Sequence, residues 1–134
     1  MKTEITQSQI DGYVDQLLNA LDKDIEQLEK NIARLDALRR LLIKQDKNAL
    51  EQLLQMIRSE VSACRQNELN RQTLRRQLAG IFNAAPKEIT LSFLLERLGQ
   101  HKNNEITKRK DALQTLTSVL KREYSATQRL LADC

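Results

Sequence analysis

The chain has 134 residues, of which 40% are hydrophobic, 30% are charged and 3% are aromatic. This length predicts one domain, and many charges with few aromatics are typical of long solvated helices rather than of a compact enzyme core. Leucine outnumbers valine by 23 to three, and there are only three glycines and one proline, which argues against a β-rich fold. The net charge of +4 is a mild bias and only weak support for a nucleic-acid partner.

The sequence also bounds the cellular setting. No apolar run approaches the roughly 20 residues that a membrane-spanning helix needs, and residues 1–10 are too polar for a secretion signal. Two cysteines, Cys64 and Cys134, cannot form a disulfide framework and are expected to be reduced thiols. We therefore expect a cytoplasmic protein without stable membrane insertion.

The first predicted element is a long helix over about residues 8–45. Apolar residues recur there every three or four positions, so they trace one helical face. Thr6 with Gln9 is a candidate capping box at its start, and Ser8 is a rival N-cap.

A second long helix is predicted over about residues 47–82. Asp46 is a suitable N-cap for it, and the helix must end before Pro86, because the residue before a proline avoids the α region. Its apolar stripe weakens between Arg65 and Thr73. Three interpretations remain open: the helix bends there, it separates from its neighbours, or its contact with them is more hydrated.

A short helix and a C-terminal helix follow. Thr90 is expected to cap the short helix, over about residues 90–98, and Gly99 to end it in a left-handed conformation. The polar stretch from residue 100 to 104 is expected to be a connection, and the last helix to run over about residues 104–132.

These elements predict an all-α fold in a single helical domain, residues 1–134. Three long amphipathic helices and one short helix are joined by short connections, so neighbours in sequence should pack antiparallel. The expected architecture is an elongated antiparallel bundle.

Few side chains are candidates for catalysis or for binding a metal or a phosphate group. His101 is the single histidine, it lies in the expected polar connection, and it has no visible catalytic partner. Two cysteines and one histidine do not make a zinc site, and the isolated glycines form no phosphate-binding loop. We therefore expect no catalytic residues, no cofactor, no metal and no enzyme activity.

Short basic runs, such as Arg39-Arg40 and Arg75-Arg76, lie on different helices and are interleaved with carboxylates. Solvated helix faces with ion pairs one turn apart explain them better than a phosphate site does. We expect no nucleic-acid partner.

The apolar stripe of the last helix is the remaining candidate site. It is either bundle core or part of a groove for an amphipathic helix of another protein. The candidate partner-binding residues are Leu113, Leu116, Val119, Leu120, Tyr124, Thr127, Leu130 and Leu131.

Three blocks of the sequence, residues 41–50, 90–95 and 120–131, give the chain a resemblance to the FlgN-like family of flagellar export chaperones. They are similar to the family's break between two long helices, to its short Thr-Leu-Ser helix and to its C-terminal helix. The chain departs from the family at Tyr124 and Thr127, where the family tends to have two asparagines.

The resemblance implies a cytoplasmic chaperone of flagellar type III export. Such a protein binds the amphipathic C-terminal helices of hook-associated (hook–filament junction) proteins, prevents their premature assembly and delivers them to the flagellar export apparatus. The alternative is a structural coiled-coil or scaffold protein that self-associates through its leucine stripes, so homo-oligomer formation stays open.

Overall fold

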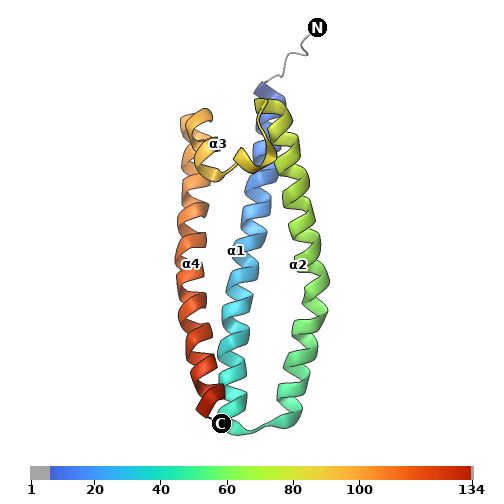
Figure 1. Cartoon of the computed structure of the whole chain (residues 1–134), viewed down its shortest axis with the longest axis vertical. Helices are drawn as coiled ribbons and strands as arrows, with labels where there is room; N and C mark the ends of the chain where they lie inside the picture. Colours follow the sequence, from blue (N-terminus) through green and yellow to red (C-terminus); the bar gives the residue numbers. More distant parts are fainter. Residues whose placement is uncertain (1–6, 134) are drawn as a thin grey trace. The chain divides into compact units, whose positions relative to one another are not determined.

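The structure, a computed structural model, describes residues 7–133, with the side chains of residues 8–132. It contains four α-helices and one 3-10 helix (Figure 1), and the described residues form no strand, which confirms the all-α fold class. The candidate capping residue Thr6 and the thiol of Cys134 lie outside the described residues. The elements are α1 (Gln7–Lys44), α2 (Lys47–Phe82), η1 (Pro86–Glu88), α3 (Leu91–Arg97) and α4 (Gln100–Asp133).

The chain divides into two compact units. Among the described residues, unit 1 comprises residues 7–23 and 67–111, and unit 2 comprises residues 24–66 and 112–133. Unit 1 therefore holds η1, α3 and one part of each long helix, whereas unit 2 consists of the other parts of α1, α2 and α4. No short helix belongs to unit 2 among the described residues.

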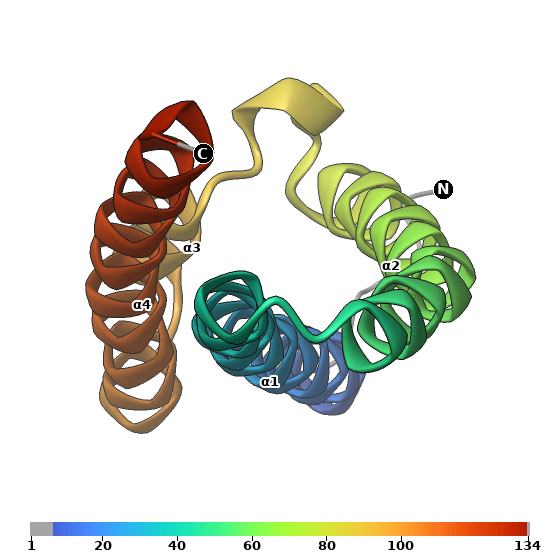
Figure 2. The same ribbon diagram turned by 90° about the horizontal axis from the view of Figure 1, so that it is seen from below.

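In each unit α1 and α2 are antiparallel, as the sequence predicted, and α4 is antiparallel to α2 and parallel to α1 (Figure 1). The ion pairs of unit 1 show that α4 runs in the same direction as α1. Lys102 binds Asp15 at 2.6 Å, and one heptad further along both helices Arg109 binds Asp22 at 2.7 Å. In unit 2, α1 lies between α2 and α4 (Figure 2).

The predicted N-cap at Asp46 is confirmed. Its carboxylate accepts a hydrogen bond from the backbone N–H of Ala49 at 3.1 Å, which satisfies one of the free donors at the start of α2. Just before it, Gln45 has a positive φ of 56°. This left-handed residue ends α1 and lets the N–H of Asp46 bond the carbonyl of Leu41.

The predicted cap at Thr90 is also confirmed. Its hydroxyl accepts a hydrogen bond from the N–H of Phe93 at 3.1 Å. The chain reaches this point from Asn83, whose φ of 52° ends α2 in the left-handed conformation, and through η1, which begins at Pro86. Because proline lacks an N–H donor and presets φ, it suits the first position of such a turn.

The expectation for Gly99 was wrong. No glycine in the described residues has a positive φ, and α3 ends at Leu98 in an extended conformation with φ −102°. The reason is that α4 starts immediately, at Gln100 rather than near residue 104, and the carbonyl of Gly99 accepts the N–H of Asn103 at 2.9 Å. Gly99 therefore begins the next helix, a position where glycine is well tolerated.

The core of unit 1 is built around α3. One buried cluster joins Leu94 of α3 to Leu74 and Leu78 of α2. A second cluster joins Val14 of α1 to Ile106 of α4, with the half-buried face of α3 against it. All three long helices thus bury apolar side chains against one seven-residue helix.

A charged network fastens α4 to α1 at the surface of unit 1. Arg109 bonds Asp22 of α1 and, at 2.9 Å, Glu105 of its own helix. The hydrogen bonds that Arg109 donates to Asp22 and Glu105 raise the pKa of Arg109, and accepting one of them lowers the pKa of Glu105. The hydrogen bond to Asp15 raises the pKa of Lys102. These groups are all favoured in their charged forms.

We expect Leu94→Ala to destabilise the protein by about 2–5 kcal/mol, because the side chain is 1% exposed and its removal leaves a cavity beneath α3. Leu69→Ala is the matched control, since Leu69 is exposed in the same unit, and it should cost less than about 0.5 kcal/mol. Urea denaturation followed by circular dichroism measures both. Equal losses would contradict the assignment of α3 to the core.

We expect stability to depend on Glu105 in acid. Because folding lowers the pKa of Glu105 from its ordinary 4.5, its contribution is fully present above pH 4.5 and is lost as the pH falls through the lowered value. Glu105→Gln should therefore flatten the decline of the urea midpoint below pH 4.5. Glu68→Gln, at an exposed position of α2, is the control, and identical pH profiles for wild type and Glu105→Gln would refute the expectation.

Candidate functional site: the uncovered apolar face of unit 2

The two units differ sharply in how well they bury apolar side chains. Of the ten buried hydrophobic residues in the described part of the chain, nine lie in unit 1 and one, Leu53, lies in unit 2. The leucine stripe of α1 shows the change along one helix. Val14, Leu18 and Leu21 are buried in unit 1, whereas Leu28 and Leu35 in unit 2 are only half-buried.

Exposed large hydrophobic residues show the opposite distribution. Seven are found in the described residues, and only Leu69 belongs to unit 1. Monomeric proteins rarely leave contiguous apolar surface uncovered unless it serves an interaction, so unit 2 is the candidate binding region. Its exposed hydrophobic residues are Ile43, Leu54, Met56, Val61, Tyr124 and Leu131.

The candidate residues of the last helix fall into three groups in unit 2. Tyr124 and Leu131 are 55% and 51% exposed, so they are accessible to a partner. Thr127 is 3% exposed and is buried within the unit. The rest are half-buried: Leu113, Leu116, Val119, Leu120 and Leu130.

Thr127 is the only buried polar residue among those that the structure describes. Its hydroxyl donates to the backbone carbonyl of Glu123, one turn earlier in α4, at 2.8 Å. This local bond satisfies the hydroxyl without any neighbour. The side chain therefore serves the packing of α4, and the accessible residues of this helix are Tyr124 and Leu131.

A hollow of about 360 Å³ lies between α1 and α2 in unit 2. Apolar side chains dominate its lining, with Leu35 and Leu38 from α1 facing Ile57 and Val61 from α2. The half-buried thiol of Cys64 also lines it. Such a hollow receives apolar side chains from a partner more readily than it receives a charged ligand.

Two ion pairs hold the three helices of unit 2 together. Arg34 of α1 binds Glu60 of α2, and Arg39 of α1 binds Glu123 of α4. Both pairs are partly exposed, so each contributes modestly to stability. They fix α2 and α4 on either side of α1 and leave the apolar residues without a fourth helix.

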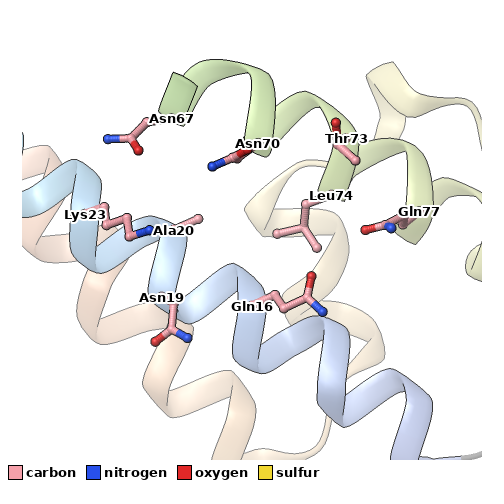
Figure 3. Close-up of a pocket in the computed structure, with 9 residues that line it drawn as sticks. All are labelled: Gln16, Asn19, Ala20, Lys23, Asn67, Asn70, Thr73, Leu74 and Gln77. Carbon is pink, nitrogen blue, oxygen red and sulfur yellow. The ribbon is translucent and has the colours of Figure 1, made fainter. Parts of the chain in front are cut away.

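A polar hollow of about 350 Å³ lies between α1 and α2 in unit 1 (Figure 3). Asn67, Asn70 and Gln77 line it from α2, and Gln16 and Lys23 line it from α1. It lies where the apolar stripe of α2 weakens, and α2 continues unbroken through that stretch. Amide side chains from both helices line the space between α1 and α2 at this stretch.

Groups with catalytic potential are scattered. His101 lies in the first turn of α4 and is exposed, rather than in a connecting loop. Within residues 7–133, no three side chains of His, Cys, Asp and Glu are placed to hold a metal ion. No helix in that range is both long enough and apolar enough to cross a membrane.

Leu54 and Val61 of α2 were not among the candidate residues predicted from the sequence, although both are exposed in unit 2. Their spacing by seven residues within the stripe of α2 was visible, but a stripe alone does not separate core from surface. What distinguishes them is the absence of α3 from their unit, and only the structure shows it.

The burial of Thr127 yields a prediction about stability. Thr127→Asp should destabilise the protein by about 2 kcal/mol or more, because a carboxylate in this buried position lacks a partner. Thr127→Val keeps the shape, loses one local hydrogen bond and should cost only about 1 kcal/mol. Chemical denaturation compares the two, and an Asp variant as stable as wild type would show that position 127 is accessible.

Comparison with protein-family models, with curated proteins and with solved structures finds no match for this chain. The resemblance to the FlgN-like chaperones therefore rests on the three sequence blocks, and the candidate site rests on the geometry of unit 2.

Proposed function

We propose that this protein is a cytoplasmic chaperone of flagellar type III export. It binds the amphipathic C-terminal helices of hook-associated proteins, shields them from premature assembly and releases them to the export apparatus. The observation that carries the proposal is the incomplete core of unit 2, which buries one hydrophobic residue and exposes six large ones among those described.

The exposed apolar residues of unit 2 can cover the apolar stripe of another helix. An amphipathic helix in water needs a surface that covers its apolar stripe, and a bundle that lacks part of its own cover supplies such a surface. Tyr124 and Leu131 are spaced by seven residues on α4 and so lie on one face of that helix. Binding at such a face needs no cofactor and is reversible, which suits release for export.

Self-association as a scaffold is the competing function, and the same exposed residues support it. The two functions differ in what happens without a partner. A scaffold forms oligomers whose size rises with concentration, whereas a chaperone binds its substrate with a fixed small stoichiometry. Sedimentation velocity of the chain alone, over a wide concentration range, separates them.

We expect calorimetric titration with the C-terminal helical segment of a hook-associated protein to show saturable binding with a negative heat-capacity change, because apolar surface is removed from water. Tyr124→Asp combined with Leu131→Asp should weaken binding about tenfold or more. Ser125→Asp, at a neighbouring exposed position of α4, should not.

The titration contradicts the proposal if the folded, helical chain shows no binding at high concentration. Circular dichroism of each variant establishes that it is folded. If the double variant loses its helicity, Tyr124 and Leu131 are structural residues and the assignment of the site fails.

A further inference from the structure

The position of α3 in unit 1 shows which face of each long helix accepts a fourth helix. On α1, Val14 packs in the cluster that α3 covers, and Leu21 lines a hollow together with Leu91 and Leu94 of α3. On α2, the ring of Phe82 lies 5.8 Å from that of Phe93 in an edge-to-face contact. These contacts identify one stripe on α1 and one on α2 that meet α3.

The third long helix meets α3 through a polar bond. On α4, Asn103 donates to the carbonyl of Leu95 at 2.6 Å. Leu21 on α1, Phe82 on α2 and Asn103 on α4 thus mark the side of each long helix that contacts α3. Residues seven positions apart on a helix lie on nearly the same side of it.

The same stripes carry apolar residues in unit 2. Seven-residue steps lead from Leu21 to Leu28 and Leu35, and from Asn103 to Tyr124 and Leu131. An ideal helix drifts by about 20° per heptad, so the three steps from Asn103 to Tyr124 shift the face by about 60° and the fourth, to Leu131, by about 80°, still less than the width of about 100° of an apolar face. On α2, seven-residue steps back from Phe82 lead to Val61 and Leu54 in unit 2.

Unit 2 thus carries apolar residues at positions related by seven-residue steps to those that contact α3 in unit 1, but α3 itself belongs to unit 1. We infer that an amphipathic helix of a partner protein docks on unit 2 against the stripes marked by Leu35, Leu54, Val61, Tyr124 and Leu131, as α3 docks in unit 1. This inference rests on the proposed function and specifies both the surface and the partner's chemistry. We call these five residues the acceptor face.

The length of the partner helix follows from the stripe on α1. From Leu28 to Leu42 the rise is about 21 Å at 1.5 Å per residue, so a helix of about four turns covers it. Its apolar positions should follow the spacing of α3, whose inward residues Leu91, Leu94 and Leu98 recur every three or four positions.

The charges beside the acceptor face specify the flanks of the partner helix. Arg58 lies one turn after Leu54, Arg65 lies one turn after Val61, and all four are exposed. Lys121 lies one turn before Tyr124 on α4. In the described part of the chain none of these three cations forms an ion pair, and Glu51 is the one carboxylate in the same heptad series as Arg58 and Arg65.

A basic rim favours a partner helix with acidic flanks. It also disfavours a second copy of this chain as the occupant. Two copies that met through the same face would place both sets of cations in one interface, because a twofold interface pairs a surface with itself. The acceptor face is therefore assigned to a different protein with Asp or Glu beside its apolar stripe.

The test uses the full chain and three peptides. One is the C-terminal helical segment of a hook-associated protein. The others are designed helices of about 18 residues, with leucines at the spacing of α3 and either glutamate or lysine flanks. We expect the glutamate peptide to bind at least about tenfold more tightly than the lysine peptide.

Two variants of α2 locate the site. Leu54→Asp with Val61→Asp should weaken binding of the glutamate peptide about tenfold or more. Leu69→Asp changes a more exposed leucine of the same helix, outside the acceptor face, and should leave binding within about twofold. Methyl chemical shifts of the wild-type chain provide a measurement that does not depend on variants, and they should move at Leu54, Val61 and Leu131 and not at Leu69.

The outcomes separate this inference from the proposed function. If the hook-associated segment binds but the α2 variants and methyl shifts are unaffected, the inference is overturned and the proposed function stands. If that segment fails while the glutamate peptide binds at the acceptor face, the inference stands and the proposed function fails. Equal binding of both designed peptides, or dimerisation of the chain that Leu54→Asp with Val61→Asp abolishes, overturns the inference.

Discussion

The structure depends on how the apolar stripes of three long helices are covered. A long amphipathic helix is marginally stable in water unless its stripe packs against something. In unit 1 a helix of seven residues provides that cover, and it draws α1, α2 and α4 into common buried clusters. The cap at Thr90 and the turn through η1 matter because they start α3 where it can reach all three helices.

Unit 2 shows what the same kind of helices do without that cover. Ion pairs from Arg34 and Arg39 hold α2 and α4 to α1, but partly exposed ion pairs remove little apolar surface from water. Leucines that would be buried under a fourth helix are half-buried there instead. The proposed chaperone role and the acceptor face both follow from this difference between the units.

Helix positions could be predicted from the sequence because the signals are local. The apolar period set the spans of α1 and α2 to within a residue, and the caps at Asp46 and Thr90 need only their neighbouring N–H groups. The start of α4 was missed because residues 100–104 are polar and lack the regular spacing of apolar residues that indicates a helix. Gly99 is also suited to either end of a helix. Of the acceptor face, Tyr124 and Leu131 were among the residues predicted from the sequence. The rest was missed, and Thr127 was wrongly grouped with them, because the exposure of Leu54 and the burial of Thr127 depend on which elements lie opposite.

The sequence separation of contacting residues bears on the order in which the chain folds. The ion pair between Arg34 of α1 and Glu60 of α2 joins residues 26 positions apart. The pairs that join α1 to α4 are 84 positions apart in unit 2, between Arg39 and Glu123, and 87 positions apart in unit 1, between Lys102 and Asp15. Contacts between distant residues close large loops and form late. We therefore expect the hairpin of α1 and α2 to form while the ribosome is still making α4, so that the contacts between α4 and α1 in each unit form last.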